Sequence, residues 1–165
     1  MSQSELPLEE RVAALLQEKH LHITTAESCT GGLIAGTLVN VAGISDAFSQ
    51  GYITYANEAK ESLLGVSHET LARYGAVSPQ TAEEMAEGAA KAANAQVSVI
   101  STGIAGPGGG TADKPVGLVY LACFYNGMVH VEKHQFSGDR QQVRRQAVDA
   151  ALQLVWQCLT EEAKG

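Results

Sequence analysis

The sequence predicts an α/β fold, a single three-layer α/β/α domain over residues 1–165 with a mixed, mostly parallel sheet. Segments of helical and strand character alternate along the chain, which is typical of crossover connections between parallel strands. Residues 97–102 have the Val- and Ile-rich composition of a buried strand. Two more strand-like runs flank Asn126-Gly127, a strong hairpin signal, so we expect one antiparallel pair as well.

The individual elements are expected at the following positions. The predicted helices cover residues 7–20, 31–41, 57–65, 67–75, 78–94 and 137–160. The predicted strands cover residues 21–26, 48–55, 97–102, 116–125 and 128–136. The N-terminal helix follows from an apolar stripe on one face, formed by Leu8, Val12, Leu15 and Leu16.

Capping residues set most of the other helix boundaries. Asn57 and Ser67 are candidate N-caps of two short helices, which Gly65 and Gly75 end. Ser78-Pro79 is a cap followed by a proline at the first helical position, and it opens an alanine-rich helix. The helix over 31–41 is a run of small residues that stops near Gly43, and the last helix is expected to start at Ser137.

Composition limits the class of protein. Hydrophobic residues make up 45% and charged residues 18% of the chain, which indicates a globular domain. The net charge of −7 argues against non-specific nucleic-acid binding, although it leaves room for a local basic patch. No run is long and apolar enough to span a bilayer, and we find no signal peptide. The odd number of cysteines, without metal-ligand spacing, favours a reducing cytoplasm.

A serine and a cysteine lie side by side on a predicted strand-to-helix turn, in the run Ala26-Glu27-Ser28-Cys29-Thr30-Gly31-Gly32. Backbone N–H groups at a helix start favour negative charge, and a hydroxyl there is well placed to act as a nucleophile. Alternatively, Ser28 or Thr30 merely caps the helix.

A glycine-rich loop over residues 103–110 directly follows the buried strand. Ligands of open α/β sheets bind at the carboxyl ends of strands, so this loop and the Ser28 turn share an edge if the strand order allows it. The loop lacks the Gly-Lys-Ser/Thr ending of a phosphate-binding Walker loop. The alternative is a flexible connection without a ligand.

Two basic groups are further candidates. Lys60 follows Tyr55 by five residues and could serve as a general base if burial lowers its pKa, whereas most lysines are simply exposed. Arg140, with Arg144 and Arg145 close behind, could bind phosphate or carboxylate oxygens, or could belong to a solvated helix face.

These residues carry a resemblance to a known family. The chain resembles the C-terminal domain of the competence/damage-inducible CinA proteins, and so the stand-alone amidohydrolases of nicotinamide mononucleotide (NMN). The runs that match are Thr25-Ala26-Glu27-Ser28-Cys29-Thr30-Gly31-Gly32, Tyr55 with Asn57 and Lys60, Gly75-Ala76-Val77-Ser78, Gly103-Ile104-Ala105-Gly106-Pro107, Lys114-Pro115-Val116-Gly117 and Phe136-Ser137-Gly138-Asp139-Arg140. They extend in order over nearly the whole chain.

The resemblance implies a hydrolase that cleaves the carboxamide C–N bond of NMN to give nicotinic acid mononucleotide and ammonia. It implies Ser28 as the nucleophile with Tyr55 and Lys60 as its partners, although Ala56 stands where the family usually has a serine. The backbone at Thr30, Gly31 and Gly32 would hold either the oxyanion or the substrate phosphate. Residues Gly103, Ile104, Ala105 and Gly106 would shape the ring pocket, and Arg140 would hold the phosphate.

The same resemblance sets the expected surroundings of the reaction. We expect pyridine-nucleotide salvage in the cytoplasm, a homo-oligomer, and neither metal nor other cofactor. Nucleic acid and membrane are not expected partners. Two rival classes stay open: a catalytically weak paralogue that only binds a nucleotide, and a cysteine hydrolase that uses Cys29 at the helix start.

Overall fold

Five strands form one sheet in the computed structural model, which describes residues 5–161. The strands are β1 (Ile23–Glu27), β2 (Tyr52–Ile53), β3 (Val97–Gly103), β4 (Leu118–Tyr125) and β5 (Met128–Gln135). Their order across the sheet is β2-β1-β3-β4-β5. β1 pairs in parallel with β2 and β3, whereas β4 pairs antiparallel with both β3 and β5. All strands except β4 therefore run in one direction within the described sheet, and the prediction of a mixed, mostly parallel sheet is confirmed in this sense.

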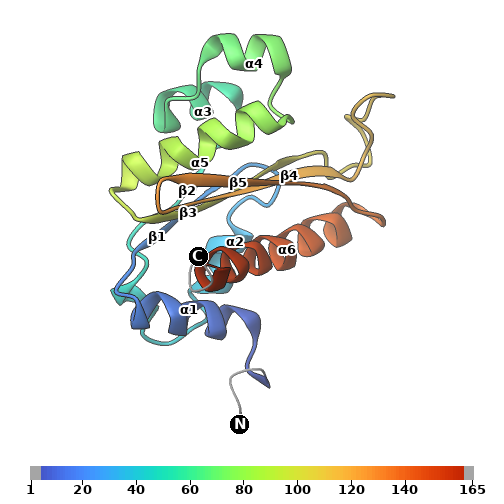
Figure 1. The fold of residues 1–165 in the computed structure, drawn as a ribbon. Helices are drawn as coiled ribbons and strands as arrows, with labels where there is room; N and C mark the ends of the chain where they lie inside the picture. Colours follow the sequence, from blue (N-terminus) through green and yellow to red (C-terminus); the bar gives the residue numbers. More distant parts are fainter. Residues whose placement is uncertain (1–4, 162–165) are drawn as a thin grey trace.

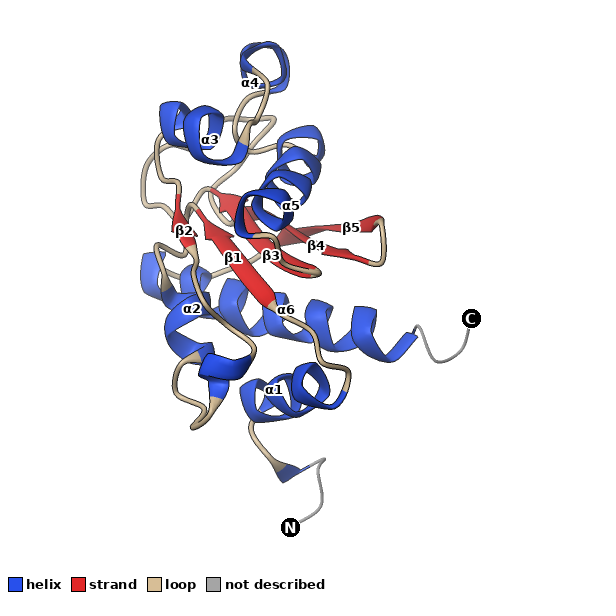
Figure 2. Ribbon diagram, turned by 90° about the vertical axis from the view of Figure 1, so that its left-hand side faces the viewer, coloured by secondary structure: helices blue, strands red, loops and turns tan. Residues whose placement is uncertain are grey.

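Helices cover both faces of the sheet. They are α1 (Leu8–Glu18), α2 (Leu33–Leu38), α3 (Asn57–Leu64), α4 (His68–Tyr74), α5 (Pro79–Ala93) and α6 (Arg140–Glu161), with a short 3₁₀ turn, η2 (Ile44–Asp46). Figures 1 and 2 show α1, α2 and α6 on one face and α3, α4 and α5 on the other. The predicted three-layer α/β/α architecture is confirmed.

Each face of the sheet has its own hydrophobic core, because side chains alternate along a strand. On β4, Val119 and Leu121 are buried in the core that α1, α2 and α6 complete. Their neighbours Tyr120 and Ala122 are buried in the second core, with residues of α3 to α5.

A glycine sets the distance between α3 and α5. A Cβ atom on Gly88 of α5 would overlap the carbonyl oxygen of Leu64, at the end of α3. Because Gly88 has no side chain, α3 rests directly on α5 at this point. This contact fixes the helix that carries Lys60.

The strand directions bring four loops to one edge of the sheet. β1, β2 and β3 are parallel, and β5 runs with them because it is separated from β3 by the antiparallel β4. The chain leaves these strands at Ser28, Thr54, Ile104 and Phe136. The Ser28 turn, the 103–110 loop and the start of α6 therefore gather at the same edge, as the sequence predicted conditionally.

Local signals predicted several boundaries correctly. The Ser78 hydroxyl accepts from the Thr81 backbone N–H at 3.1 Å, and Pro79 is the first residue of α5. Such a cap stabilises a helix by about 1 kcal/mol. At the hairpin, Asn126 and Gly127 both have positive φ, 56° and 77°, which the tight turn requires.

Several predictions of local structure were wrong. The last helix begins at Arg140 and not at Ser137. The helix expected over 31–41 spans only Leu33–Leu38, because Gly31 and Gly32 have positive φ and the chain leaves the helix in tighter turns beyond Leu38. The strand expected over 48–55 is reduced to Tyr52–Ile53 with one isolated bridge at Phe48. Asn57 is the first helical residue of α3, and Ala56 stands at the N-cap position without a side-chain bond.

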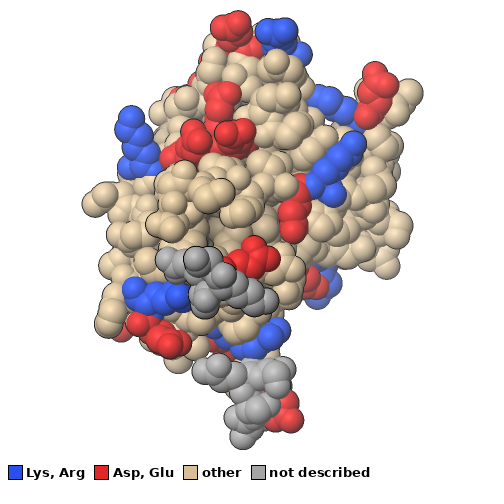
Figure 3. Space-filling view, viewed as in Figure 1, with Lys and Arg blue, Asp and Glu red and all other residues tan. Residues whose placement is uncertain are grey.

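Charged side chains of both signs are interspersed on the face shown in Figure 3, so this face has no continuous basic surface. No helix within residues 5–161 combines the length and the apolar character that crossing a lipid bilayer requires.

Candidate active site

Ser28 lies directly after β1 and is held by β3. Its side chain and backbone are largely buried, with 8% exposure. The Ser28 backbone N–H donates to the Ser101 carbonyl at 3.0 Å and also lies 3.3 Å from the Ser101 hydroxyl. These contacts extend the pairing between β1 and β3 by one residue, so the serine stands on a rigid element.

Lys60 reaches Ser28 from the other helical layer. It belongs to α3 and is only 1% exposed, which is rare for a lysine. Its Nζ lies 3.2 Å from Ser28 Oγ, 2.8 Å from the Thr54 carbonyl oxygen and 3.3 Å from that of Tyr55. The carbonyls that end β2 therefore turn toward the lysine, which is one reason that β2 is short.

Burial lowers the pKa of Lys60 from its ordinary value of 10.5, with a smaller opposing effect from Cys29. An ammonium can donate to all three of its neighbours. A neutral amine can donate to the Thr54 and Tyr55 carbonyls, and its lone pair then faces the Ser28 hydroxyl. The geometry is that of a base aligned on a nucleophile.

Tyr55 and Arg140 lie at the mouth of the site. The Tyr55 side chain is 62% exposed, and its hydroxyl accepts from Arg140 Nη2 at 3.0 Å. Arg140 Nη1 donates to the Gly106 carbonyl at 2.8 Å. Tyr55 thus meets Lys60 through its backbone, whereas its hydroxyl bonds to Arg140.

These groups surround a cavity of about 210 Å³. It is lined by Ser28, Cys29, Tyr55, Lys60, Ala76, Val77, Thr102, Gly103, Ala105 and Arg140. Three of the lining residues, Ala76, Val77 and Thr102, have no role in the sequence-based site. The Thr102 hydroxyl donates to the Ala76 carbonyl at 2.8 Å, which joins the end of β3 to the turn before α5.

Comparison with known proteins identifies the family. The sequence model described as the CinA C-terminal domain matches residues 5–159. The chain belongs to this family. A "CinA-like protein" from Kosmotoga olearia is 54% identical over 152 residues, an alignment that covers 92% of this chain and 37% of that protein. The chain thus spans little more than a third of that curated relative.

Solved structures show the same fold. The competence/damage inducible protein CihA from Agrobacterium tumefaciens is 46% identical, with a TM-score of 0.89 and 93% of both chains covered. A CinA superfamily protein from Klebsiella pneumoniae is 35% identical, with a TM-score of 0.90 over 98% of this chain and 99% of that one.

In this CinA domain, the turn Thr30-Gly31-Gly32 does not line the cavity. The Glu27 carboxyl group already occupies the start of α2, where it accepts from the backbone N–H groups of Ile34 and Ala35 at 2.8 and 3.0 Å. Glu27 thus takes up two N–H groups in the first turn of α2, whereas the expected role of Thr30, Gly31 and Gly32 in holding the oxyanion or the phosphate stays a prediction.

Two members of the expected ring pocket line the cavity and two do not. Gly103 and Ala105 belong to its wall, whereas Ile104 and Gly106 lie outside the lining. Gly106 still contributes, because its carbonyl oxygen accepts from Arg140.

The arginine that follows Arg140 by one helical turn has another task. Arg144 donates from Nε to the Cys29 carbonyl at 3.0 Å and from Nη2 to the Thr30 carbonyl at 3.1 Å. It holds the turn after Ser28 from the α6 side, so its guanidinium is already engaged by these two carbonyls.

Cys29 is poorly suited to be the nucleophile. Burial raises the pKa of its thiol to about 11. Since the thiolate is the reactive form, the raised pKa makes Cys29 a weaker candidate nucleophile than Ser28.

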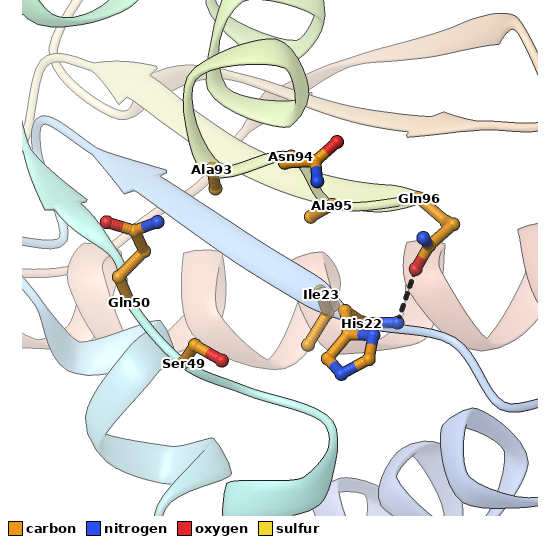
Figure 4. Close-up of a pocket in the computed structure, with 8 residues that line it drawn as sticks. All are labelled: His22, Ile23, Ser49, Gln50, Ala93, Asn94, Ala95 and Gln96. Atoms are coloured by element: carbon orange, nitrogen blue, oxygen red, sulfur yellow. Dashed lines mark hydrogen bonds between the residues drawn. The ribbon is translucent and has the colours of Figure 1, made fainter.

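A second hollow of about 340 Å³ lies at the opposite edge of the sheet (Figure 4). It is lined by His22, Ile23, Ser49, Gln50, Ala93, Asn94, Ala95 and Gln96. Gln96 accepts from the His22 backbone N–H at 2.8 Å. Across the described residues, no three His, Cys, Asp or Glu side chains are grouped so that they could hold a metal ion.

Proposed function

We propose that this CinA domain hydrolyses the carboxamide of NMN, with Ser28 as the nucleophile and Lys60 as the general base. The observation that carries the proposal is the 3.2 Å contact between Lys60 Nζ and Ser28 Oγ inside the protein. A lysine buried without a carboxylate partner costs stability, so its position beside a serine favours a chemical role.

In the first half of the reaction, Ser28 Oγ attacks the carboxamide carbon while its proton moves to Lys60. The tetrahedral intermediate then breaks its C–N bond, and Lys60 returns the proton to the leaving nitrogen, which departs as ammonia. In the second half, Lys60 takes a proton from water as the water attacks the acyl-serine ester. The ester C–O bond then breaks and Lys60 returns this proton to Ser28 Oγ, which releases nicotinic acid mononucleotide and restores the neutral amine and the serine hydroxyl.

The oxyanion needs hydrogen-bond donors close to Ser28. We assign the first of these to the Cys29 backbone N–H, because the residue after a nucleophile on a strand-to-helix turn commonly supplies one. Arg144 and β3 fix this peptide by their bonds to the Cys29 carbonyl and to Ser28.

Arg140 is the candidate partner of the substrate phosphate. Its bonds to Gly106 and Tyr55 hold the guanidinium at the mouth of the cavity and leave further N–H donors free. Arginine is well suited to phosphate because its donors match the spacing of the oxygens.

The test is incubation of the purified protein with NMN, with nicotinic acid mononucleotide measured by chromatography and ammonia by an enzymatic assay. We expect equal amounts of both products, loss of both in Ser28→Ala, and their retention in Cys29→Ala. Binding of NMN without either product would instead make the domain a nucleotide-binding module, and loss of activity in Cys29→Ala alone would favour a cysteine hydrolase.

A further inference from the structure

A chain of hydrogen bonds runs beneath the nucleophile and ends on a buried carboxyl group. The Ser28 backbone N–H lies 3.3 Å from Ser101 Oγ, which lies 2.7 Å from Thr30 Oγ1. Thr30 Oγ1 in turn donates to Glu27 Oε1 at 2.6 Å. Glu27, Thr30 and Ser101 are completely buried, and none of them lines the cavity.

The chain has a single direction. Glu27 accepts three bonds, from the Thr30 hydroxyl and from the backbone N–H groups of Ile34 and Ala35, so both of its oxygens act as acceptors. Thr30 spends its only proton on Glu27 and must accept from Ser101. The hydroxyl proton of Ser101 therefore points to Thr30, and the Ser101 oxygen accepts from the Ser28 backbone N–H.

Glu27 has no compensating cation. Within residues 5–161, no Lys, Arg or His side chain forms an ion pair with its carboxyl group. A buried carboxyl group that is satisfied only by N–H and O–H donors is expensive compared with an apolar residue of the same size. Its retention under the Ser28 turn points to a task at that turn.

We propose that Glu27 is a positioning residue, which acts through Thr30 and Ser101 to fix the backbone of Ser28 relative to Lys60. This inference rests on the proposed role of Ser28 as the nucleophile. The turn is held on its other side by Arg144, which binds the Cys29 and Thr30 carbonyls. With both sides fixed, Ser28 Oγ stays within reach of Lys60 Nζ, and small displacements of a nucleophile are costly for the rate.

A matched pair of substitutions at Thr30 tests the proposal. Thr30→Val keeps the shape of the side chain but removes the hydroxyl, whereas Thr30→Ser keeps the hydroxyl and loses a methyl group. We expect Thr30→Val to lower kcat about ten- to hundredfold with KM within about twofold of wild type, and Thr30→Ser to keep kcat within about threefold. The pKa of Lys60, measured from the pH profile, should not move in either variant.

A role in packing alone predicts the opposite order, because the serine variant loses more buried volume. Equal kcat in Thr30→Val and wild type, or greater loss in Thr30→Ser than in Thr30→Val, would overturn the proposal. Thr37→Val, on the helix α2 that follows the turn, is the control, since the Thr37 hydroxyl donates to the Leu33 carbonyl and has no contact with the chain of hydrogen bonds. We expect wild-type kcat from this variant.

Glu27→Gln tests the end of the chain. A glutamine has one acceptor oxygen and one donor NH₂ group in place of the two acceptor oxygens. Its NH₂ group must therefore face either the Ala35 N–H or the two donors Thr30 O–H and Ile34 N–H, and in both cases donor faces donor. We expect a loss of kcat of the same order as in Thr30→Val. Thermal unfolding of each variant is measured in parallel, and the Thr30 pair provides the answer if Glu27→Gln does not fold.

A substrate-independent measurement separates this proposal from the proposed function. A fluorophosphonate probe labels activated serines, and the rate of its addition to Ser28 is followed by intact mass. Slower labelling in Thr30→Val than in Thr30→Ser supports positioning even if NMN is not a substrate. Identical labelling rates in wild type and Thr30→Val overturn it even if NMN is hydrolysed, and a wild-type Ser28 that is never labelled overturns both proposals.

Discussion

The hollow at the amino ends of the strands and the cavity at their carboxyl ends differ in how deeply their polar side chains are buried. The hollow at the amino ends of β1 and β3 is the larger, at about 340 Å³, yet its polar side chains are exposed. The cavity at the carboxyl ends is about 210 Å³ and contains a buried lysine in contact with a buried serine. The larger hollow is therefore not the one that contains the buried lysine and serine. Polar groups that are costly to bury identify the chemical site more reliably.

The strongest test of this difference between the two edges is to remove one serine hydroxyl from each. We expect Ser28→Ala to lower kcat for NMN by about a thousandfold or more, because no covalent intermediate can form. Ser49→Ala, in the hollow at the other edge, should leave kcat unchanged. Product formation by chromatography measures both. Substantial turnover in the Ser28 variant would move the chemistry elsewhere.

Replacement of the buried lysine should have the next largest effect. We expect Lys60→Ala to lower kcat by about a hundred- to ten thousandfold, the range typical for loss of a general base. Lys60→Arg should not restore activity, because a guanidinium stays protonated. The exposed Lys91 of α5 provides the control, and Lys91→Ala should behave as wild type.

The pH profile adds to this test. Only the neutral amine can accept a proton, so kcat should rise with pH through the lowered pKa of Lys60. An arginine variant with full activity at neutral pH would exclude a base at this position.

Arg140→Ala should affect binding more than chemistry. We expect KM for NMN to rise about ten- to hundredfold, because a charged hydrogen-bonded pair contributes about 1.5–3 kcal/mol. Nicotinamide riboside lacks the phosphate, so its kcat/KM should barely change. Arg145→Ala, an exposed neighbour on α6, serves as the matched control. Equal losses with both substrates would assign Arg140 to the chemistry or the fold.

The smallest expected effect concerns stability. The pKa of Lys60 is lower in the folded than in the unfolded chain, so between that lowered value and 10.5 the unfolded state binds more protons. The contribution of Lys60 to the free energy of unfolding should therefore rise with pH through this window. Below it, both states are protonated, and the cost of burying the ammonium is fully present.

Lys60→Met removes this dependence. Denaturant unfolding of wild type and variant across the window should give a difference in unfolding free energy that shifts in favour of wild type as the pH rises. A difference that stays constant with pH would mean that burial does not disfavour the ammonium.

The sequence predicted the structure well wherever a few neighbouring residues determine it. Ser78-Pro79 starts a helix and Asn126-Gly127 closes a hairpin because their preferences depend on a few neighbouring residues. The predicted strand over 48–55 does not continue beyond Ile53, where the Thr54 and Tyr55 carbonyls bind Lys60, a contact that no local pattern encodes.

The candidate site was predictable to a similar degree. The run around Ser28 has the features of a functional turn, but nothing in the run indicates that Glu27 accepts from the backbone N–H groups of Ile34 and Ala35 at the start of α2. Ala76 and Val77 reach the cavity only because α5 packs on the sheet, and apolar residues of this kind have no chemical signature. Thr102 lies next to the carboxyl end of β3, at the edge of the sheet where ligands bind. This position is the feature of the sequence that could have predicted Thr102 as a lining residue.

Because α3 rests on α5 at Gly88, Lys60 is held in place by helix packing and not by the strands of the sheet. Ser28 belongs to the sheet, whereas Lys60 arrives on a separate short helix that rests on α5. Such peripheral units open at lower free energy than the central strands, as hydrogen exchange shows for many proteins. Heating should thus separate the two groups while the sheet is intact, so loss of turnover will precede the loss of circular dichroism.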